Sequence, residues 1–338
     1  MKHCRFSFLS RPSFQIIIGS AICLLAAVGC GSSDSGSAPG APTAKTDTVK
    51  AGQKPTVALV MKSLANEFFQ TMQKGAEKHN SEHSSDYTLI SNGIKDEQDV
   101  AKQQELVQQM AGQAVGAIVI APADSKALIP VCEKAMKAGI AVVNIDNKFD
   151  RDVLTSRHLA IPFVGPDNRK GAKLAGDYLA KKLKAGDEVA IVEGAPNAFN
   201  GIQRKLGFED AIKAANLKLV DSQTGRWETA EANKVFAAML TSHPNLKAVL
   251  CANDNMALGA LAALKAAGKK GAVIVVGFDN ITAVRDLVKS GDILCTVDQH
   301  ADQLATFGIQ YALDIVSKKA SPVDKETPVD LITQADVK

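Results

Sequence analysis

Short apolar runs alternate with helix-length amphipathic segments along nearly the whole chain from Pro55 onward. Residues 56–61, 116–120 and 140–145 are rich in Val and Ile, and the segments between such runs carry apolar residues at helical spacing. Apolar runs separated by helices are typical of buried parallel strands in βαβ units. The alternation therefore predicts an α/β fold built on parallel sheets.

The expected strands are numerous. They lie at residues 56–61, 87–90, 116–120, 140–145, 159–164, 188–192, 218–220, 248–251, 273–276, 293–297 and 328–332. The expected helices lie at residues 66–79, 96–110, 125–137, 168–183, 203–215, 229–240, 256–267, 283–289 and 301–317, and residues 148–157 read as irregular. We expect Gly139 and Gly268 to end helices in the left-handed conformation. Because one doubly wound sheet seldom holds more than about ten strands, two sheets and hence two lobes are expected.

Ligands of open α/β sheets bind beside the carboxyl ends of the strands, so residues that directly follow the runs are candidate site residues. Those positions carry carboxylates, amides and aromatic rings. The candidates are Lys62, Ser63, Asn66, Phe68, Phe69, Asp146, Asn147, Asn253, Asp254, Phe278, Asp279, Asp298 and Gln299. Carboxylates and amides pair with vicinal hydroxyls, and flat rings cover the C–H face of a sugar. The set therefore predicts a polyol site.

Each candidate also has a purely structural interpretation. Asp and Asn after a strand are common N-caps of the next helix. Phe68 and Phe69 lie about 100° apart on a helix, so we expect one of them to face the site. Trp227, between Arg226 and Glu228 and outside any apolar run, suits packing and a site equally. The recurrence of such residues after five strands favours the site.

The first thirty residues have the composition of an export signal. They contain three basic and no acidic residues, followed by an apolar stretch that is short for a membrane-spanning helix. Residues 27–30, Ala-Val-Gly-Cys, resemble the lipobox of bacterial lipoproteins, which implies that Cys30 is lipidated and begins the mature chain. Cleavage without lipidation and an uncleaved anchor are the alternatives.

Residues 31–54 contain Val49 as their single large apolar residue, so we expect a flexible tether. The formal charge of +3 belongs to residues 1–30, and the rest of the chain is formally neutral. Nucleic-acid binding, which needs a clustered basic face, is therefore not expected. Together these segments predict an exported protein held at the cell envelope by a lipid, on its periplasmic or extracellular face.

Six segments of the chain resemble the ribose-binding group of type I periplasmic sugar-binding proteins. They are LVMKSLANEFF (59–69), VVNIDN (142–147), DNRKGAKLAGDYLAKKL (167–183), CANDNMALGALAALKAAG (251–268), VVGFDN (275–280) and TVDQ (296–299). The resemblance extends from Pro55 through residue 338 in the same element order. Lactose-repressor-type transcription factors share this core, but they carry a DNA-binding helix-turn-helix where this chain has the signal and tether.

The resemblance implies two doubly wound parallel-sheet lobes joined by a three-crossover hinge. The lobes would comprise residues 55–165 plus 300–326 and residues 166–299 plus 327–338, closing on one monosaccharide or related polyol. The implied partners are an ABC permease and, through it, ATPase subunits, and the implied state is a monomer without cofactor or metal. A sugar or autoinducer receptor for chemotaxis or a sensor kinase is the alternative role.

By matching position, the resemblance also assigns sugar contacts. Stacking is implied for Phe68, Phe69, Trp227 and Phe278, hydroxyl acceptance for Asp146 and Asp279, and mixed hydrogen bonding for Asn66, Asn253 and Gln299.

Four positions depart from the family pattern. Asn147 and Ala121 stand where the family has an arginine and a polar residue, and Lys62 replaces a small residue. Another family arginine aligns with Ile202, although Arg204 follows two residues later and stays a candidate. Because a site that bonds hydroxyls discriminates strongly on such details, a different pentose, a hexose or another polyol is expected as readily as ribose.

Enzymatic signatures are scarce in the sequence. Phosphate-loop, zinc-protease and serine-hydrolase motifs are absent, and no two histidines are expected at metal-ligand spacing. Asp146 and Asp279 could form a glycosidase pair, which is the enzymatic alternative. Cys132, Cys251 and Cys295 are expected as buried free thiols, with a bridge between the last two as the alternative.

Overall fold

The computed structural model describes residues 54–337, which hold twelve strands and ten helices. The expectations for the signal, for Cys30 and for residues 31–53 of the tether lie outside the described residues. None of the helices in residues 54–337 combines the length and the apolar character that crossing a bilayer requires.

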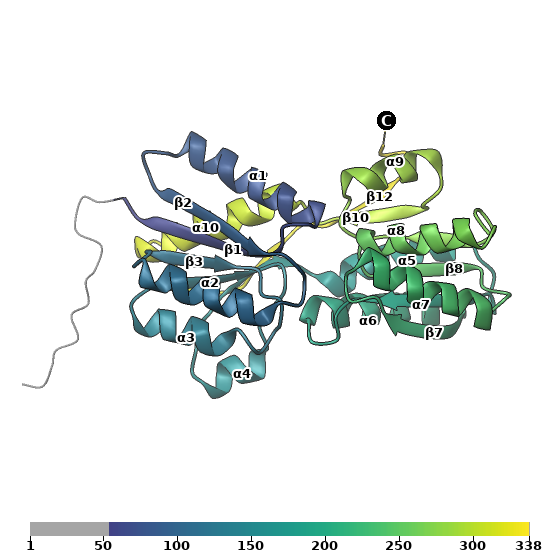
Figure 1. The fold of residues 1–338 in the computed structure, drawn as a ribbon, viewed down its shortest axis with the longest axis horizontal. Coiled ribbons are helices and arrows are strands. Elements are labelled where there is room, and N and C mark those ends of the chain that lie inside the picture. Colours follow the sequence, from purple (N-terminus) through teal and green to yellow (C-terminus); the bar gives the residue numbers. More distant parts are fainter. Residues whose placement is uncertain (1–53, 338) are drawn as a thin grey trace, which may run out of the picture. The chain divides into compact units, whose positions relative to one another are not determined.

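The first lobe is built on a six-stranded sheet with the order β11-β5-β4-β3-β1-β2. Its strands are β1 (Thr56–Ser63), β2 (Thr88–Ile94), β3 (Ala117–Ile120), β4 (Ala141–Ile145), β5 (Phe163–Pro166) and β11 (Lys325–Thr327). Its helices are α1 (Glu67–Glu82), α2 (Val100–Gly112), α3 (Ile129–Lys137), α4 (Arg151–Ser156) and α10 (Ala301–Val316). In Figure 1, α1 and α10 cover one face of this sheet, and α2 and α3 cover the other.

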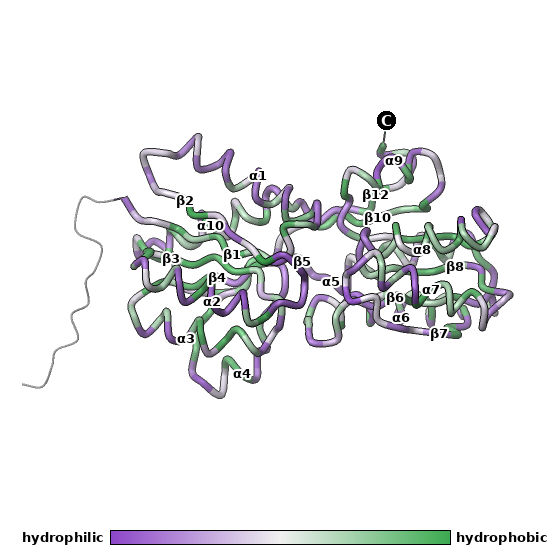
Figure 2. The backbone as a smooth tube through the Cα atoms, in the orientation of Figure 1, coloured by the Kyte–Doolittle hydropathy of each residue, from purple (hydrophilic) through white to green (hydrophobic). Residues whose placement is uncertain are grey.

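The two helical layers explain why β1 is apolar without interruption from Val57 to Met61. Val57, Leu59 and Met61 pack into the core under α1 and α10, whereas Ala58 and Val60 pack into the core under α2 and α3. Successive side chains of a strand point to opposite faces, so a strand covered on both faces must be apolar at every position. Figure 2 shows β1 and β3 as hydrophobic segments for this reason.

The second lobe repeats this plan with the order β12-β10-β9-β8-β6-β7. Its strands are β6 (Glu188–Glu193), β7 (Lys218–Thr224), β8 (Ala248–Cys251), β9 (Ile274–Val276), β10 (Cys295–Asp298) and β12 (Asp330–Thr333). Its helices are α5 (Asn168–Ala180), α6 (Phe199–Ala214), α7 (Thr229–Ser242), α8 (Asp254–Ala266) and α9 (Thr282–Ser290). The chain passes between the lobes three times, after β5, β10 and β11, which confirms the predicted two-lobed, three-crossover fold.

Several local expectations were wrong. Strand β12 pairs with β10 in antiparallel fashion, Cys295 opposite Thr333, because the short link from β11 leaves no room for a parallel crossover. Residues 148–157 contain helix α4, which the Asp150 side chain caps by accepting from the Val153 amide (2.9 Å). Strand β5 begins at Phe163, four residues later than expected. Strand β11 is polar, so no apolar run in the sequence predicted it.

Other local expectations were confirmed. Gly139 and Gly268 have φ of +85° and +64°, as helix ends in the left-handed conformation require. Among the described residues, Cys132, Cys251 and Cys295 are buried free thiols. Cys251 and Cys295 lie on strands separated by β9, so they do not form the alternative bridge.

Candidate functional site

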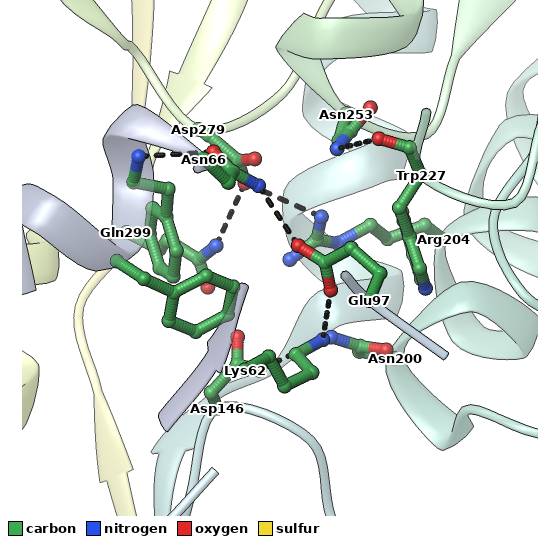
Figure 3. A pocket seen from close by; sticks show the side chains of 12 residues that line it. Lys62, Asn66, Glu97, Asp146, Asn200, Arg204, Trp227, Asn253, Asp279 and Gln299 are labelled. Carbon is green, nitrogen blue, oxygen red and sulfur yellow. Dashed lines mark hydrogen bonds and ion pairs between the residues drawn. The ribbon is translucent and has the colours of Figure 1, made fainter. Parts of the chain in front are cut away.

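A small cavity lies where the carboxyl ends of the strands of the two sheets face each other. Twelve side chains line it (Figure 3), namely Lys62, Asn66, Phe68, Phe69, Glu97, Asp146, Asn200, Arg204, Trp227, Asn253, Asp279 and Gln299.

Strand ends supply most of this lining. Lys62 lies at the end of β1, Asp146 directly follows β4, and Asn253 and Asp279 lie two and three residues after β8 and β9. Asn66 and Asn253 also cap the helices that begin there, because their side-chain oxygens accept from backbone amides of α1 and α8. For these two asparagines the capping interpretation and the site placement therefore hold together, and the cap fixes the side chain that faces the cavity.

Three lining residues hold unusual backbone conformations. Asp146, Trp227 and Asp279 have φ of 60°, 70° and 125°, a region that residues with a side chain rarely adopt. Such conformations persist where the surrounding structure determines them, and they cluster at functional sites.

The first lobe contributes a buried ionic cluster. The Lys62 ammonium lies 3.3 Å from the Asp146 carboxylate and 3.5 Å from that of Glu97. The Asn66 amide donates to the other Glu97 oxygen at 3.0 Å, which orients this carboxylate. Lys62 also lies over the rings of Phe69 and Trp227, at 5.3 and 5.4 Å from their centroids. These contacts hold four polar groups of one lobe rigidly at the cavity wall.

The second lobe contributes a pair built around Arg204 of α6. Its Nε donates to Asn168 (2.8 Å), and its Nη1 donates to the Ala252 carbonyl (2.9 Å) and to Asp279 (3.3 Å). Its guanidinium lies 3.8 Å from the Phe278 centroid, a cation–π contact. The Gln299 amide donates to the same Asp279 oxygen at 2.8 Å. Arg204 is thereby fixed with its remaining nitrogen free.

Aromatic rings form the apolar walls. Phe68 and Phe69 meet edge to face with centroids 5.1 Å apart, and both line the cavity. The expectation that only one faces the site was therefore wrong, because the cavity lies over the first turn of α1, where the start of the helix is open on two sides. Across the cavity, the Trp227 ring rests against Gly194 and Gly201, positions where a Cβ would approach ring carbons to 2.1 and 3.0 Å.

Burial and pairing act against each other on these charges. Burial would lower the pKa of Lys62, but the Asp146 and Glu97 carboxylates outweigh it and hold that pKa above its ordinary value. Burial raises the pKa of Glu97 and raises that of Asp279 well above its ordinary value, although Lys62 and Arg204 oppose these shifts. Burial also lowers the pKa of Arg204. Pairing thus sets opposite charges side by side on the buried wall of the cavity.

Polar atoms of the lining that make no hydrogen bond indicate which kind of molecule the cavity binds. Within residues 54–337, five buried polar atoms of its lining make no hydrogen bond, namely Glu97 Oε2, Asp146 Oδ2, Arg204 Nη2, Trp227 Nε1 and Gln299 Oε1, although the two carboxylate oxygens face the Lys62 ammonium. Buried polar atoms are nearly always hydrogen-bonded, so an occupant must satisfy these. Three acceptors and two donors around a small cavity with aromatic walls match a molecule rich in hydroxyls, each of which donates and accepts.

The structure places ten of the thirteen sequence-predicted ligand contacts on the cavity lining, and their binding of a ligand stays a prediction. Ser63, Asn147 and Phe278 do not line it. Ser63 donates to the Lys95 carbonyl, which follows β2, and Phe278 lies against the Arg204 guanidinium. Asn147 donates to the Pro122 carbonyl and accepts from the Asn200 amide, so it connects the lobes beside the cavity.

Sequence reasoning missed Glu97 and Asn200. Glu97 follows β2, but the apolar run ends at Ile90 while the strand continues through polar residues to Ile94. The search for residues directly after each apolar run therefore ended before it reached Glu97. Asn200 lies in the first turn of α6, seven residues after β6. The sequence predicted that Ile202 leaves the site without one of the family arginines. This was wrong, because Ile202 is 45% exposed and Arg204 on the same helix supplies a guanidinium to the site.

Comparisons with known proteins agree with this geometry. Residues 57–320 match the family described as periplasmic binding protein domain. A D-ribose/D-allose-binding protein of Pseudomonas aeruginosa is 54% identical over 285 residues, which is 83% of this chain and 89% of the relative. A solved ABC transporter solute-binding protein from Burkholderia multivorans is 57% identical, with a TM-score of 0.81 over 83% of this chain and all of that one. Another from Actinobacillus succinogenes, with bound D-allose, is 35% identical, with a TM-score of 0.80 over 84% and 99%.

Proposed function

The chain belongs to the periplasmic binding protein domain family, and from this premise we propose that it binds D-allose or D-ribose in the cavity and delivers the sugar to an ABC importer. The five polar atoms of the lining that make no hydrogen bond carry the proposal, because ring hydroxyls would pair with them. The relatives that bind ribose and allose narrow the choice of sugar.

Allose and ribose share one stereochemical pattern. In their pyranose forms, the ring hydroxyls at C2, C3 and C4 have the same configuration, and allose adds a hydroxymethyl group at C5. A site that reads those three hydroxyls therefore accepts both sugars, and it rejects an epimer because inverting one hydroxyl leaves buried polar groups unpaired.

Calorimetric titration of the protein without residues 1–30 tests the sugar. We expect 1:1 binding of D-allose and D-ribose, and at least a hundredfold weaker binding of their C3 epimers D-glucose and D-xylose. Equal binding of each sugar and its epimer would contradict the proposal, and so would failure of both allose and ribose to bind.

Two neighbours on α6 provide a matched pair of variants. Arg204→Ala removes the forked donor beside Asp279 and should abolish measurable sugar binding. Ile202→Ala changes an exposed side chain two residues away and should bind sugar like the parent protein. Far-UV circular dichroism checks that both variants fold. If Arg204→Ala still bound sugar, the proposal that sugar binds in this cavity would be wrong.

We extend the proposal to the domain organisation and the location of the protein. Residues 1–30 would direct export, Cys30 would carry the lipid and residues 31–54 would tether lobes of residues 55–165 plus 300–326 and 166–299 plus 327–338. Mass spectrometry of the membrane fraction should find an acylated Cys30 at the mature N-terminus. Cys30→Ala should release the protein into the soluble envelope fraction. A Cys30→Ala variant that stays membrane-bound would contradict lipid anchoring.

Export of family relatives to the periplasm supports the envelope location. For partners, we propose an ABC permease with its ATPase subunits, and a chemotaxis or sensor-kinase receptor as the second candidate. Stimulation of ATP hydrolysis by the sugar-loaded protein in proteoliposomes containing the permease supports transport. Loss of sugar response without loss of uptake in a deletion strain supports signalling.

One observation favours a glycosidase as a further candidate, because burial raises the pKa of Asp279 well above its ordinary value, as an acid catalyst needs. Against it, Gln299 and Arg204 both donate to one Asp279 oxygen, so that oxygen is already engaged. Incubation with aryl glycosides decides between the two, since a binding protein releases no reducing sugar.

A further inference from the structure

The C-terminal end of α1 carries two histidines on one side, His79 in the last turn and His83 at the C-cap. His79 and His83 are four residues apart, and their ring centroids lie 4.4 Å from each other with the planes inclined by 31°. Side chains at this spacing are neighbours on a helix surface. The expectation that no two histidines stand at ligand spacing was therefore wrong for this pair, and the pair lies at the opposite end of α1 from Phe68 and the cavity.

Each ring is held through the same nitrogen. His79 Nδ1 lies 2.8 Å from the Tyr87 hydroxyl, and His83 Nδ1 lies 3.3 Å from the Asp86 carboxylate. Metal-binding histidines characteristically coordinate through one nitrogen while a carboxylate or other polar group holds the second. Within residues 54–337, no hydrogen bond occupies the Nε2 of either ring. Both Nε2 atoms are therefore available on neighbouring rings.

The surroundings keep the pair ready to bind a cation. The Tyr87 hydroxyl can accept the Nδ1 proton of His79, which leaves the Nε2 lone pair of that ring to coordinate. The acidic side chains of Glu82 and Asp86 flank the pair on the same segment, whereas the nearby Lys54 ammonium donates to the Ser84 carbonyl.

We propose that the C-terminal turn of α1 binds a divalent transition ion such as Zn²⁺ or Ni²⁺ through the Nε2 atoms of His79 and His83. Imidazole nitrogens suit these ions. In the described part of the chain no three His, Cys, Asp or Glu side chains surround one point, so water completes the coordination. The ion links two successive turns and thereby stabilises the end of α1 and the turn that leads to β2.

Titration of the tag-free protein without residues 1–30 tests the site. We expect one Zn²⁺ or Ni²⁺ per chain near neutral pH, and selective broadening of the His79 and His83 imidazole signals by paramagnetic Ni²⁺. His79→Ala and His83→Ala should each weaken binding at least tenfold, whereas the control His243→Ala, in the second lobe, should leave it unchanged. Binding that survives in both α1 variants, or that is lost equally in the control, would overturn the proposal.

Two further measurements separate metal binding from a structural role of the histidines. Tyr87→Phe removes the hydroxyl beside His79 Nδ1 and should weaken Zn²⁺ binding severalfold without abolishing it. Sugar affinity should be the same in all these variants, because the pair does not line the cavity. Zn²⁺ should raise the melting temperature of the parent protein but not of His83→Ala. An equal rise in both would contradict the site.

Discussion

At the scale of single residues, the shape of the cavity depends on closely packed positions where the neighbouring side chains cannot move. The Trp227 ring lies against the backbone of Gly194, where an added Cβ would come within 2.1 Å of a ring carbon. Trp227 itself has a positive φ, so its backbone cannot easily move to compensate. The glycine thus sets how far the indole extends into the cavity.

Gly194→Ala should push the Trp227 ring into the space of the ligand. We expect sugar affinity to fall at least tenfold, with a visible change in tryptophan fluorescence, since Trp227 is the single tryptophan of the chain. Gly186→Ala changes a glycine with open space around it and serves as the control for binding, although its φ of +86° will cost some stability. Unchanged affinity in Gly194→Ala would show that the ring can retreat.

Asp254 predicts a pH dependence of folding stability. It is fully buried behind β8, and burial raises its pKa to about 7 although Thr296 and backbone amides donate to it. Because the folded pKa is above the unfolded one, the native state holds the proton more tightly. Its stabilising contribution is complete below about pH 4 and is lost as the pH rises to about 7.

The expected loss is at most about 1.4 kcal/mol per pH unit in that window. Urea unfolding of the parent and of Asp254→Asn between pH 5 and 7 measures it, and the variant should show a flatter dependence. The neighbouring Asp279 and Arg204 interact with Asp254, so the difference between the two proteins, rather than either slope alone, is the test. Parallel slopes would contradict the assignment to Asp254.

At the scale of elements, small residues allow α5 and α6 to pack closely on one face of the second sheet. A Cβ on Gly207 would meet the Arg169 carbonyl at 2.2 Å, and a Cβ on Gly176 would meet Ala211 at 2.5 Å. Each glycine faces the other helix at the point of closest approach. The position of α6 matters for function because this helix carries Arg204 and Asn200.

Gly207→Ala should therefore destabilise the protein, although alanine is the better helix former by about 1 kcal/mol. The obstacle is the backbone of α5, so we expect a net loss of about 1–3 kcal/mol, as for overpacked cores. Gly112→Ala is the matched control, since that glycine ends α2 with no atom within 4 Å. Denaturant unfolding should show that Gly207→Ala lowers the free energy of unfolding and that Gly112→Ala raises it. Equal changes in the two variants would contradict the close contact.

At the scale of the whole described chain, a few polar contacts hold the lobes closed around the cavity. The Glu67 carboxylate accepts from the Thr282 amide at the start of α9 (2.8 Å), and Asn197 donates to Asp124 (2.6 Å). A carboxylate at a helix N-terminus is typically worth about 0.3–1 kcal/mol. Since these contacts join residues of different lobes, they favour the closed form, and closure is what encloses a ligand.

Glu67→Ala should lower sugar affinity about two- to fivefold, the ratio that about 0.3–1 kcal/mol provides. Glu77→Ala, on the same helix and bonded within it to Gln73, is the control and should bind like the parent protein. Small-angle scattering without sugar should show a more open average form for Glu67→Ala. Equal affinities of the two variants would show that this contact contributes nothing to closure.

Local pattern determined most of the architecture. The apolar runs and the helical spacing between them were enough to predict two parallel-sheet lobes, since both depend on side-chain periodicity along one stretch of chain. They also located Asp146, Asn253 and Asp279 at strand ends, where such sheets bind ligands. The pattern failed for β11 and for the antiparallel β12, because pairing at a sheet edge depends on neighbours distant in sequence.

Tertiary structure alone decided which candidates share one cavity. The sequence by itself determined that carboxylates, amides and aromatic rings follow the strands. In the folded protein, however, Phe278 packs against the Arg204 guanidinium and Asn147 connects the two lobes. Glu97 entered the cavity from a loop beyond a strand whose second half is polar, and it did so by pairing with Lys62. Side-chain direction and ionic pairing arise only when segments far apart in the chain meet, so residue order predicts the chemistry of the site and packing decides its members.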